Sequence, residues 1–401
     1  MNVLKSSAHA GHTPNENRWG AVFALALGAF ALVASEFLPV SLLTPIASDL
    51  SVTEGQAGQG IAVSGAFALV TSLFIASIVG KLDRKILLLL LTVLMILSGT
   101  VVALAPNYLI FMLGRALIGV SIGGFWSLSA ATAMRLVEPQ QVPRALAVVN
   151  GGNALAMVVA APLGSFLGSI IGWRGAFFCI VPVALLALMW LLFSLPGMPA
   201  GHHKPTDNAF TLLKRPPVVL GMLAISALFM GQFALFTYLR PFLETVTQVG
   251  VNGLSLILLA LGAAGLVGTI LIGGLLQKGL YRILVSVPIL MAGIALALVA
   301  FGSSMWATTL LLAVWGLVAT AAPVAWWTWL ARTLPDDAEA GGGLMVAVVQ
   351  LAITLGAMTG GWVFDSAGYR GTFELSAAIL LGAAMLAFVA YKRAAQPALA
   401  A

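Results

Sequence analysis

Charged side chains are scarce in this sequence. They make up 8% of its 401 residues, whereas apolar residues make up 61%. A soluble globular domain carries about 25% charged residues. So few charges do not cover the surface of a water-soluble protein, and the composition therefore predicts a protein that crosses a membrane several times.

Cysteine and histidine are also nearly absent. The one cysteine, Cys179, lies in an apolar run, which excludes a disulfide framework and predicts a small core residue. All four histidines lie in polar segments, and the adjacent pair among them is a poor ligand set, so we expect no metal site; they are His9, His12, His202 and His203. A G-x4-G-K-[ST] phosphate loop is missing as well. We therefore expect no metal, no cofactor and no ATP hydrolysis.

Basic residues outnumber acidic ones, with a net charge of +6, but they are scattered in short loops and do not suggest a nucleic-acid partner. Residues 1–17 are polar and lack the apolar core of a signal peptide, so we expect the first apolar segment to remain in the mature protein.

Long apolar segments dominate what is present, and they predict an all-α membrane protein with twelve transmembrane helices in two six-helix bundles. We expect tails over 1–18 and 392–401, bundles over 19–195 and 217–391, and a linker over 196–216. The predicted spans are 19–43, 57–79, 86–105, 108–134, 145–168, 175–195, 217–239, 253–276, 283–302, 306–330, 342–364 and 374–391.

Lysine and arginine are distributed unevenly between the two sides of these spans. Twelve spans place both termini on one side, and that side collects all of the Lys and Arg residues except Arg115, Arg174, Arg240 and Arg370. The positive-inside rule therefore predicts that both termini are cytoplasmic.

The two halves of the chain repeat one another at a constant separation of 196 positions. Glu36 corresponds to Gln232, Pro45 to Pro241, and the stretch 172–177 (GWRGAF) to 368–373 (GYRGTF). Both halves contain six spans, so they enter the membrane in the same direction. Such a parallel repeat predicts a binding site near the membrane midplane, where the halves meet, with rocking between them.

Glu36 is the ionisable residue of the first predicted span. An acid in the middle of a spanning helix costs about 2.5–3.5 kcal/mol on insertion scales, so such residues are functional by default. Burial disfavours the charged form of a carboxyl, which makes Glu36 a candidate proton carrier. The alternative is a structural acid that pairs with Arg115 or a glutamine. Gln232, its repeat counterpart, does not titrate and can offer neutral hydrogen bonds.

Several motifs resemble the major facilitator superfamily, in particular its twelve-helix drug:proton antiporter branch. Asp83 and Arg84 match the gating loop of that family, although the Gly and Arg that follow in its pattern are missing here. Arg115 with Gly119 and Gly123 resembles a second motif, whose buried arginine is linked to proton coupling. A snorkelling arginine at the interface is the alternative reading of Arg115.

The fifth span resembles the antiporter motif of this branch in part. Gly152, Pro162 and Gly164 match, whereas Ala161, Ser165 and Phe166 stand where the family has glycine. The stretches 34–39 (ASEFLP) and 323–329 (PVAWWTW) are similar to purine ribonucleoside exporters. That resemblance implies a monomeric transporter of the bacterial inner membrane that exports inosine- and guanosine-type nucleosides in exchange for protons.

Further candidate ligands come from residue chemistry. Asn150 and Asn153 lie on one face of the fifth span; we favour a role in helix packing for Asn150 and the cavity for Asn153. Aromatic faces stack on purines, so the remaining candidates are Phe125, Trp126, Trp326 and Trp327, while the depth of Trp329 favours an interfacial belt.

Other functions stay open at this point. A drug or sugar exporter of the same branch would share every feature described, because a fold does not determine a substrate. An uncoupled facilitator is a second alternative. A membrane-embedded enzyme is disfavoured, since the core of the spans offers only Glu36 and Arg115 as charged groups for catalysis.

Overall fold

The computed structural model describes residues 18–78, 82–199, 209–334 and 337–395, and all regular structure in these ranges is helical. The helices run as α1 Trp19–Leu50, α2 Glu54–Ile78, α3 Arg84–Ala103, α4 Tyr108–Arg135, η1 Pro139–Gln141, α5 Val142–Phe178, α6 Ile180–Ser194, η2 Ala209–Lys214, α7 Pro216–Phe236, α8 Leu239–Thr245, α9 Val251–Phe301, α10 Met305–Ala319, α11 Ala322–Thr333 and α12 Ala338–Ala395.

Ten stretches of the described residues are helical, apolar and long enough to cross a membrane, and two of them contain two spans each. Arg144–Ser194 covers 51 residues and Gly341–Arg393 covers 53, whereas one crossing needs about 20. Each bends at a glycine with positive φ, Gly172 at 72° and Gly368 at 66°. Divided there, the stretches make the twelve spans that the sequence predicts.

These two bends occupy equivalent positions of the repeat. Because a positive φ is strained for residues with a Cβ, glycine is the residue that turns the chain between two antiparallel spans here. Gly172 and Gly368 are 196 positions apart, so the duplication seen in the sequence is also a duplication of backbone conformation.

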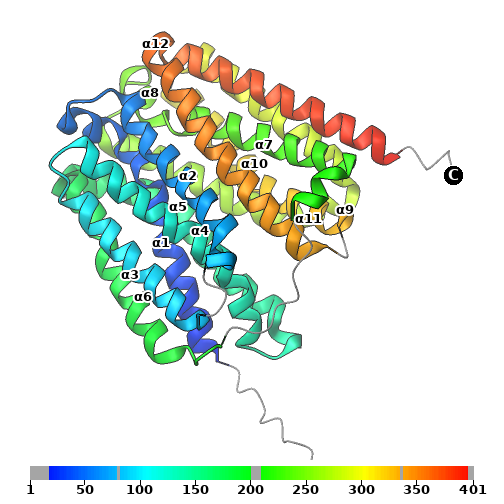
Figure 1. Ribbon diagram of the computed structural model, residues 1–401. Helices are drawn as coiled ribbons and strands as arrows, with labels where there is room; N and C mark the ends of the chain where they lie inside the picture. The colour runs from blue at the N-terminus through cyan, green and yellow to red at the C-terminus, as the bar shows by residue number, and fades with distance from the viewer. Residues whose placement is uncertain (1–17, 79–81, 200–208, 335–336, 396–401) are drawn as a thin grey trace, which may run out of the picture.

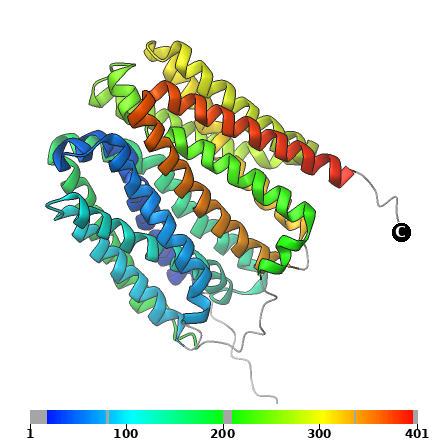
Figure 2. The same cartoon turned by 45° about the horizontal axis from the view of Figure 1, so that its top comes forward.

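The two halves form separate bundles, α1–α6 and α7–α12 (Figure 1). They meet at the end opposite the one where α1 begins and α12 ends, and their other ends diverge in both views (Figure 2). The main contacts between the bundles are those of α2 with α12, α5 with α9, and α1 with α8.

Small residues allow the helices within and between bundles to approach closely. A Cβ on Gly119 or Gly123 of α4 would lie 2.3 Å from a carbonyl oxygen of α2. Gly356 and Gly360 of α12 lie in the same way against α7, with 2.4 and 2.7 Å to its carbonyl oxygens. These glycines are therefore points of close approach between neighbouring helices.

The tenth span is broken. It ends as α10 at Ala319 and resumes as α11 at Ala322, with Pro323 in the first turn of the new helix. Proline lacks the N–H that would bond to the carbonyl of Ala319, so the helix is interrupted at this point.

Candidate functional site

Glu36 lies in the middle of α1, at the interface between the two bundles. The residue is 4% exposed. Next to it, the ring of Phe37 stacks on Phe233 of α7, with ring centroids 5.6 Å apart. Phe37 and Phe233 are repeat counterparts, and two equivalent residues touch where the pseudo-twofold axis passes. The carboxyl of Glu36 therefore lies beside the axis about which the bundles are related.

The amide of Gln350 in α12 lies beside the Glu36 carboxyl, so this polar contact joins the two bundles. Gln350 is 7% exposed, and Gln232 of α7 is 8% exposed. The Oε1 atoms of both amides are buried without a hydrogen-bond partner among the described residues. A buried acceptor without a donor costs about 1–3 kcal/mol. A ligand with N–H or O–H groups would satisfy these oxygens.

Arg115 of α4 is completely buried, at 0% exposed, and does not snorkel to an interface. Its Nε donates to the carbonyl of Gly60 at 3.0 Å, and its Nη1 donates to the carbonyl of Ser35 at 2.8 Å. Its Nη2 donates to the carbonyl of Glu36 at 2.9 Å and to Ser64 Oγ at 3.0 Å. The guanidinium thus holds α1, α2 and α4 together.

A proline explains why Arg115 finds a free acceptor in α1. Pro39 lies inside that helix and has no N–H to donate to the carbonyl four residues earlier, which is that of Ser35. Arg115 donates to this carbonyl instead. All of these bonds go to backbone or hydroxyl oxygens, so Arg115 does not bind the Glu36 carboxyl directly and acts on it only through its charge. The carboxyl keeps its side-chain contact with Gln350.

The segment predicted as a gating loop is anchored inside the N-terminal bundle. Asp83 caps α3 by accepting from the backbone N–H of Lys85 at 2.7 Å, and its Oδ1 also accepts from the N–H of Met198 at 3.0 Å. Lys85 Nζ donates to the carbonyl of Leu195 at 2.7 Å. The backbone N–H of Arg84 donates to the carbonyl of Met198 at 3.0 Å. Residues 79–81 lie outside the described part of the chain, so a gating role stays a prediction.

The motif residues of α5 are contact points with two neighbouring helices. A Cβ on Gly164 would lie 2.6 Å from Leu38 Cδ1 and Ser41 Oγ of α1. Pro162 leaves the carbonyl of Val158 without its helical donor. A Cβ on Gly262 of α9 would lie 2.9 Å from that carbonyl oxygen, so α9 of the other bundle packs where α5 is interrupted.

Gly152 offers a direct test of this packing, because its neighbour Gly151 is a matched control. A Cβ on Gly152 would lie 2.1 Å from the carbonyl oxygen of Ala26, whereas a Cβ on Gly151 would meet nothing within 4 Å. We expect Gly152→Ala to force α1 and α5 apart and to destabilise the protein by about 1–3 kcal/mol. We expect Gly151→Ala to be neutral or to stabilise by up to about 1 kcal/mol. Thermal unfolding in detergent measures both, and equal midpoints would contradict the close approach.

Comparison with known proteins identifies the family. The model of the Major Facilitator Superfamily matches residues 25–352. The chain belongs to the Major Facilitator Superfamily. Members of this family are transporters and not enzymes. This chain is accordingly a multi-pass membrane transporter, similar to bacterial members of the family.

Two curated relatives cover nearly the whole chain. The transcription regulatory protein OpdE of Pseudomonas aeruginosa is 63% identical over 93% of this chain and 95% of that protein. The purine ribonucleoside efflux pump NepI of Escherichia coli is 43% identical over 92% of this chain and 93% of that protein. Among solved structures, a bacterial homologue of the human lysosomal transporter Spinster shares the fold, with a TM-score of 0.79, 18% identity and coverage of 95% of this chain and 98% of that one.

Two of the aromatic residues expected to bind the substrate of this transporter lie in the N-terminal bundle. The ring of Phe125 is buried against Gly28 of α1 and is not open to a ligand. Trp126 meets it edge to face at 6.2 Å and is half-buried. Of this pair, Trp126 is therefore the ring that a purine could reach.

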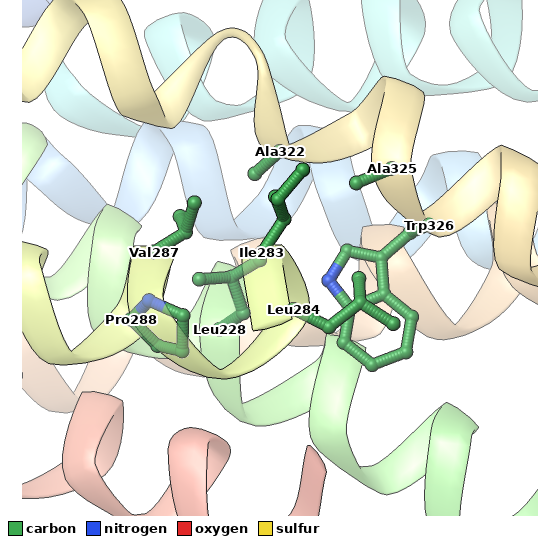
Figure 3. A pocket seen from close by; sticks show the side chains of 8 residues that line it. All are labelled: Leu228, Ile283, Leu284, Val287, Pro288, Ala322, Ala325 and Trp326. Atoms are coloured by element: carbon green, nitrogen blue, oxygen red, sulfur yellow. The ribbon is translucent and has the colours of Figure 1, made fainter. Parts of the chain in front are cut away.

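The tryptophans of α11 differ from one another. Trp326 is buried and lines a narrow pocket with residues of α7 and α9, all within the C-terminal bundle (Figure 3). The pocket has no room for a water-sized sphere, whereas small-molecule sites enclose about 300–1,000 Å³, so it is too small for a nucleoside. Trp327 is 46% exposed, in contrast to the buried rings of Trp326 and Trp329.

The expectation that Trp329 lies at the membrane–water interface is wrong. Its indole is buried, packs edge to face on Trp326, and lies where a Cβ on Gly221 of α7 would come within 2.0 Å. A glycine in the neighbouring helix provides the space for this ring, which hydropathy alone does not reveal.

The asparagines of α5 and the cysteine also require comment. Asn150 is exposed and donates to the carbonyl of Leu146 in its own helix at 2.9 Å, so the expected link to another helix is not observed there. Asn153 is half-buried and stays a candidate ligand. Cys179 is exposed, so the expectation of a core residue is wrong. The four histidines lie outside the described residues, within which no cluster of metal-ligating side chains occurs.

Gln350, Phe37 and Phe233 are the residues of this site that the sequence analysis missed. A signal for the two phenylalanines exists, because they directly follow Glu36 and Gln232 and occupy equivalent positions of the repeat. Gln350 is a polar residue in an apolar span, and its sequence position alone does not show which helix it faces.

Proposed function

We propose that this transporter exports purine ribonucleosides, such as inosine and guanosine, in exchange for protons across the bacterial inner membrane. The observation that carries the proposal is the buried carboxyl of Glu36 at the bundle interface, next to an amide of the opposite bundle. The name of the relative NepI supplies the substrate class. The distribution of Lys and Arg supports cytoplasmic termini. We propose that the monomer is the functional unit.

Each residue has a defined part in this proposal. Glu36 binds and releases the proton, and Arg115 positions α1 around it without taking part in proton transfer, because a guanidinium stays charged. Gln232, Gln350 and Asn153 offer amide groups to ribose hydroxyls and purine edges.

The exposed faces of Trp126 and Trp327 stack on the base. Phe125 and Trp326 contribute packing in the conformation described, since both rings are buried.

The energetics are sufficient for export. One charge that crosses 100 mV releases about 2.3 kcal/mol, which corresponds to roughly a fifty-fold concentration ratio of a neutral solute. One proton moving inward per nucleoside moving outward would use this potential together with the pH gradient.

An efflux assay tests the substrate and the coupling together. Cells that express the protein are loaded with radiolabelled inosine, and retention is measured with and without an uncoupler. We expect retention to fall several-fold on expression and to recover when the uncoupler is added. Unchanged retention of inosine with faster loss of a sugar or a drug would favour another exporter of the family. Faster loss that the uncoupler does not affect would favour a facilitator.

The name of the relative OpdE motivates a second candidate, an effect on transcription. Because the described chain is built of membrane-spanning helices, such an effect would be indirect, through the cellular level of a transported molecule. A variant that folds but does not export the substrate distinguishes the two. A transcript change that depends on transport disappears with it, whereas a change that persists would require a signalling role.

A further inference from the structure

The end at which the bundles meet contains a carboxylate that caps a helix of the opposite bundle. Asp365 of α12 accepts from the backbone N–H of Gly55 at 3.0 Å and from Thr53 Oγ1 at 2.6 Å. Both donors lie at the start of α2, which begins at Glu54. The first N–H groups of a helix lack partners within it, and the N-terminus attracts negative charge. Asp365 therefore satisfies the N-terminus of α2 from the other bundle.

A second polar contact across the same interface depends on a proline. Pro45 lies in α1 and leaves the carbonyl of Ser41 without its helical donor. Arg240 of α8 donates its Nη1 to this carbonyl. Its Nε donates to Glu244 at 2.8 Å, so the charge of this largely buried guanidinium is balanced within α8. Arg240, which belongs to the C-terminal bundle, thus replaces the backbone N–H that α1 of the N-terminal bundle lacks at Pro45.

Tyr238 packs closely against α2 of the other bundle at this interface. Its hydroxyl donates to the carbonyl of Ala357 in its own bundle at 2.8 Å. A Cβ on Gly58 of α2 would lie 2.2 Å from that hydroxyl oxygen. Opening this end therefore separates a packed interface and leaves the carbonyl of Ser41 and the N-terminus of α2 without these partners.

We propose that Asp365 and Arg240 form a two-point latch that holds the end opposite the termini closed and is released each time that end opens. In an alternating-access cycle the latch sets the balance between the two orientations of the transporter. The proposal does not depend on the identity of the substrate or on proton coupling.

The two points differ in strength. Arg240 is largely buried, so salt screens its contact little. Asp365 is exposed, so its contribution is smaller and decreases as salt concentration increases. This difference gives the latch a signature that packing alone would not produce.

The same end of the protein offers matched controls. Asp49 of α1 pairs with Arg174 of α5, and both belong to the N-terminal bundle. Asp49→Ala and Arg174→Gln remove the same kinds of side chain from the same end without touching a contact between bundles.

Labelling of a cysteine at position 61 measures the opening. Ile61 is buried where α2 packs against the C-terminal bundle, and Cys179 is replaced by serine so that it does not react. Ile61→Cys is reacted with a membrane-impermeant maleimide in proteoliposomes, and the rate reports the population of the open state. Loss of a cap corresponds to about 1 kcal/mol, or about five-fold in this population.

We expect Asp365→Ala and Arg240→Gln to accelerate labelling about five-fold or more relative to Asp49→Ala and Arg174→Gln. We expect the effect of Asp365→Ala, but not that of Arg240→Gln, to shrink in 1 M salt, and Arg240→Lys to restore part of the slow rate. If one variant fails to elute as a single species from gel filtration, the other decides. Labelling of the latch variants at the rate of the controls would overturn the proposal.

Discussion

Replacing Glu36 by glutamine is expected to abolish the proton-driven concentration of substrate while leaving downhill movement intact. Glutamine keeps the size and the polar contact with Gln350 but does not bind and release a proton. In proteoliposomes with an imposed membrane potential of about 100 mV, the wild type should approach a concentration ratio of roughly fifty. Glu36→Gln should stop at a ratio near one, and the substrate should no longer drive a change in internal pH.

Asp49→Asn is the control for this experiment, since Asp49 is the other acid of α1 and pairs with Arg174 away from the bundle interface. It should concentrate substrate like the wild type. Glu36→Asp keeps a titratable group and should retain part of the coupling. A Glu36→Gln variant that still accumulates substrate against its gradient would show that the proton is carried elsewhere.

The second large effect is expected for Arg115. Arg115→Gln removes a buried guanidinium that makes four hydrogen bonds, three to backbone carbonyls and one to the hydroxyl of Ser64. Hydrogen bonds to charged groups each contribute about 1.5–3 kcal/mol, although such contributions do not add fully. We expect a loss of at least about 3 kcal/mol in stability and loss of transport. Arg115→Lys should recover little, because an ammonium is a point donor and lacks the planar fork.

A double-mutant cycle tests why Arg115 is needed. Pro39→Ala supplies the N–H that the carbonyl of Ser35 lacks. Removing Arg115 should then be less costly, so the double variant should be more stable than the sum of the single effects predicts. Thermal unfolding in detergent measures the cycle. Asp49→Asn, which breaks a half-exposed surface ion pair with Arg174, should change stability by less than about 1 kcal/mol. Additive effects of Pro39→Ala and Arg115→Gln would contradict the role given to the proline.

The fold was accessible from the sequence for a physical reason. The length and apolarity of a spanning helix are set by the bilayer, so they are local properties of about 20 residues. The repeat then relates distant places, and Gly172 and Gly368 show that it extends to the backbone. Glu36 also stood out without a structure, because an acid inside an apolar span is costly wherever it points.

The partners of those residues required the tertiary structure. Arg115 binds backbone oxygens and not the Glu36 carboxylate, and Trp329 packs inside the bundle because Gly221 leaves room for it. Hydropathy is the same for every rotation of a helix about its axis, so it does not tell which face meets a neighbour. The neighbours are chosen when whole bundles pack.

The sequence by itself determined that this chain crosses the membrane twelve times as two related halves with one acid in the first span. Only the tertiary structure decided that Glu36 faces Gln350, that prolines in α1 leave carbonyls for Arg115 and Arg240, and that Asp365 caps a helix of the other bundle. Crossing a bilayer is decided by the residues of each segment alone, whereas these contacts join different helices. The contact of Arg115 forms when the helices of the N-terminal bundle pack, and the others join residues about 300 positions apart or fewer and form only when the halves are docked.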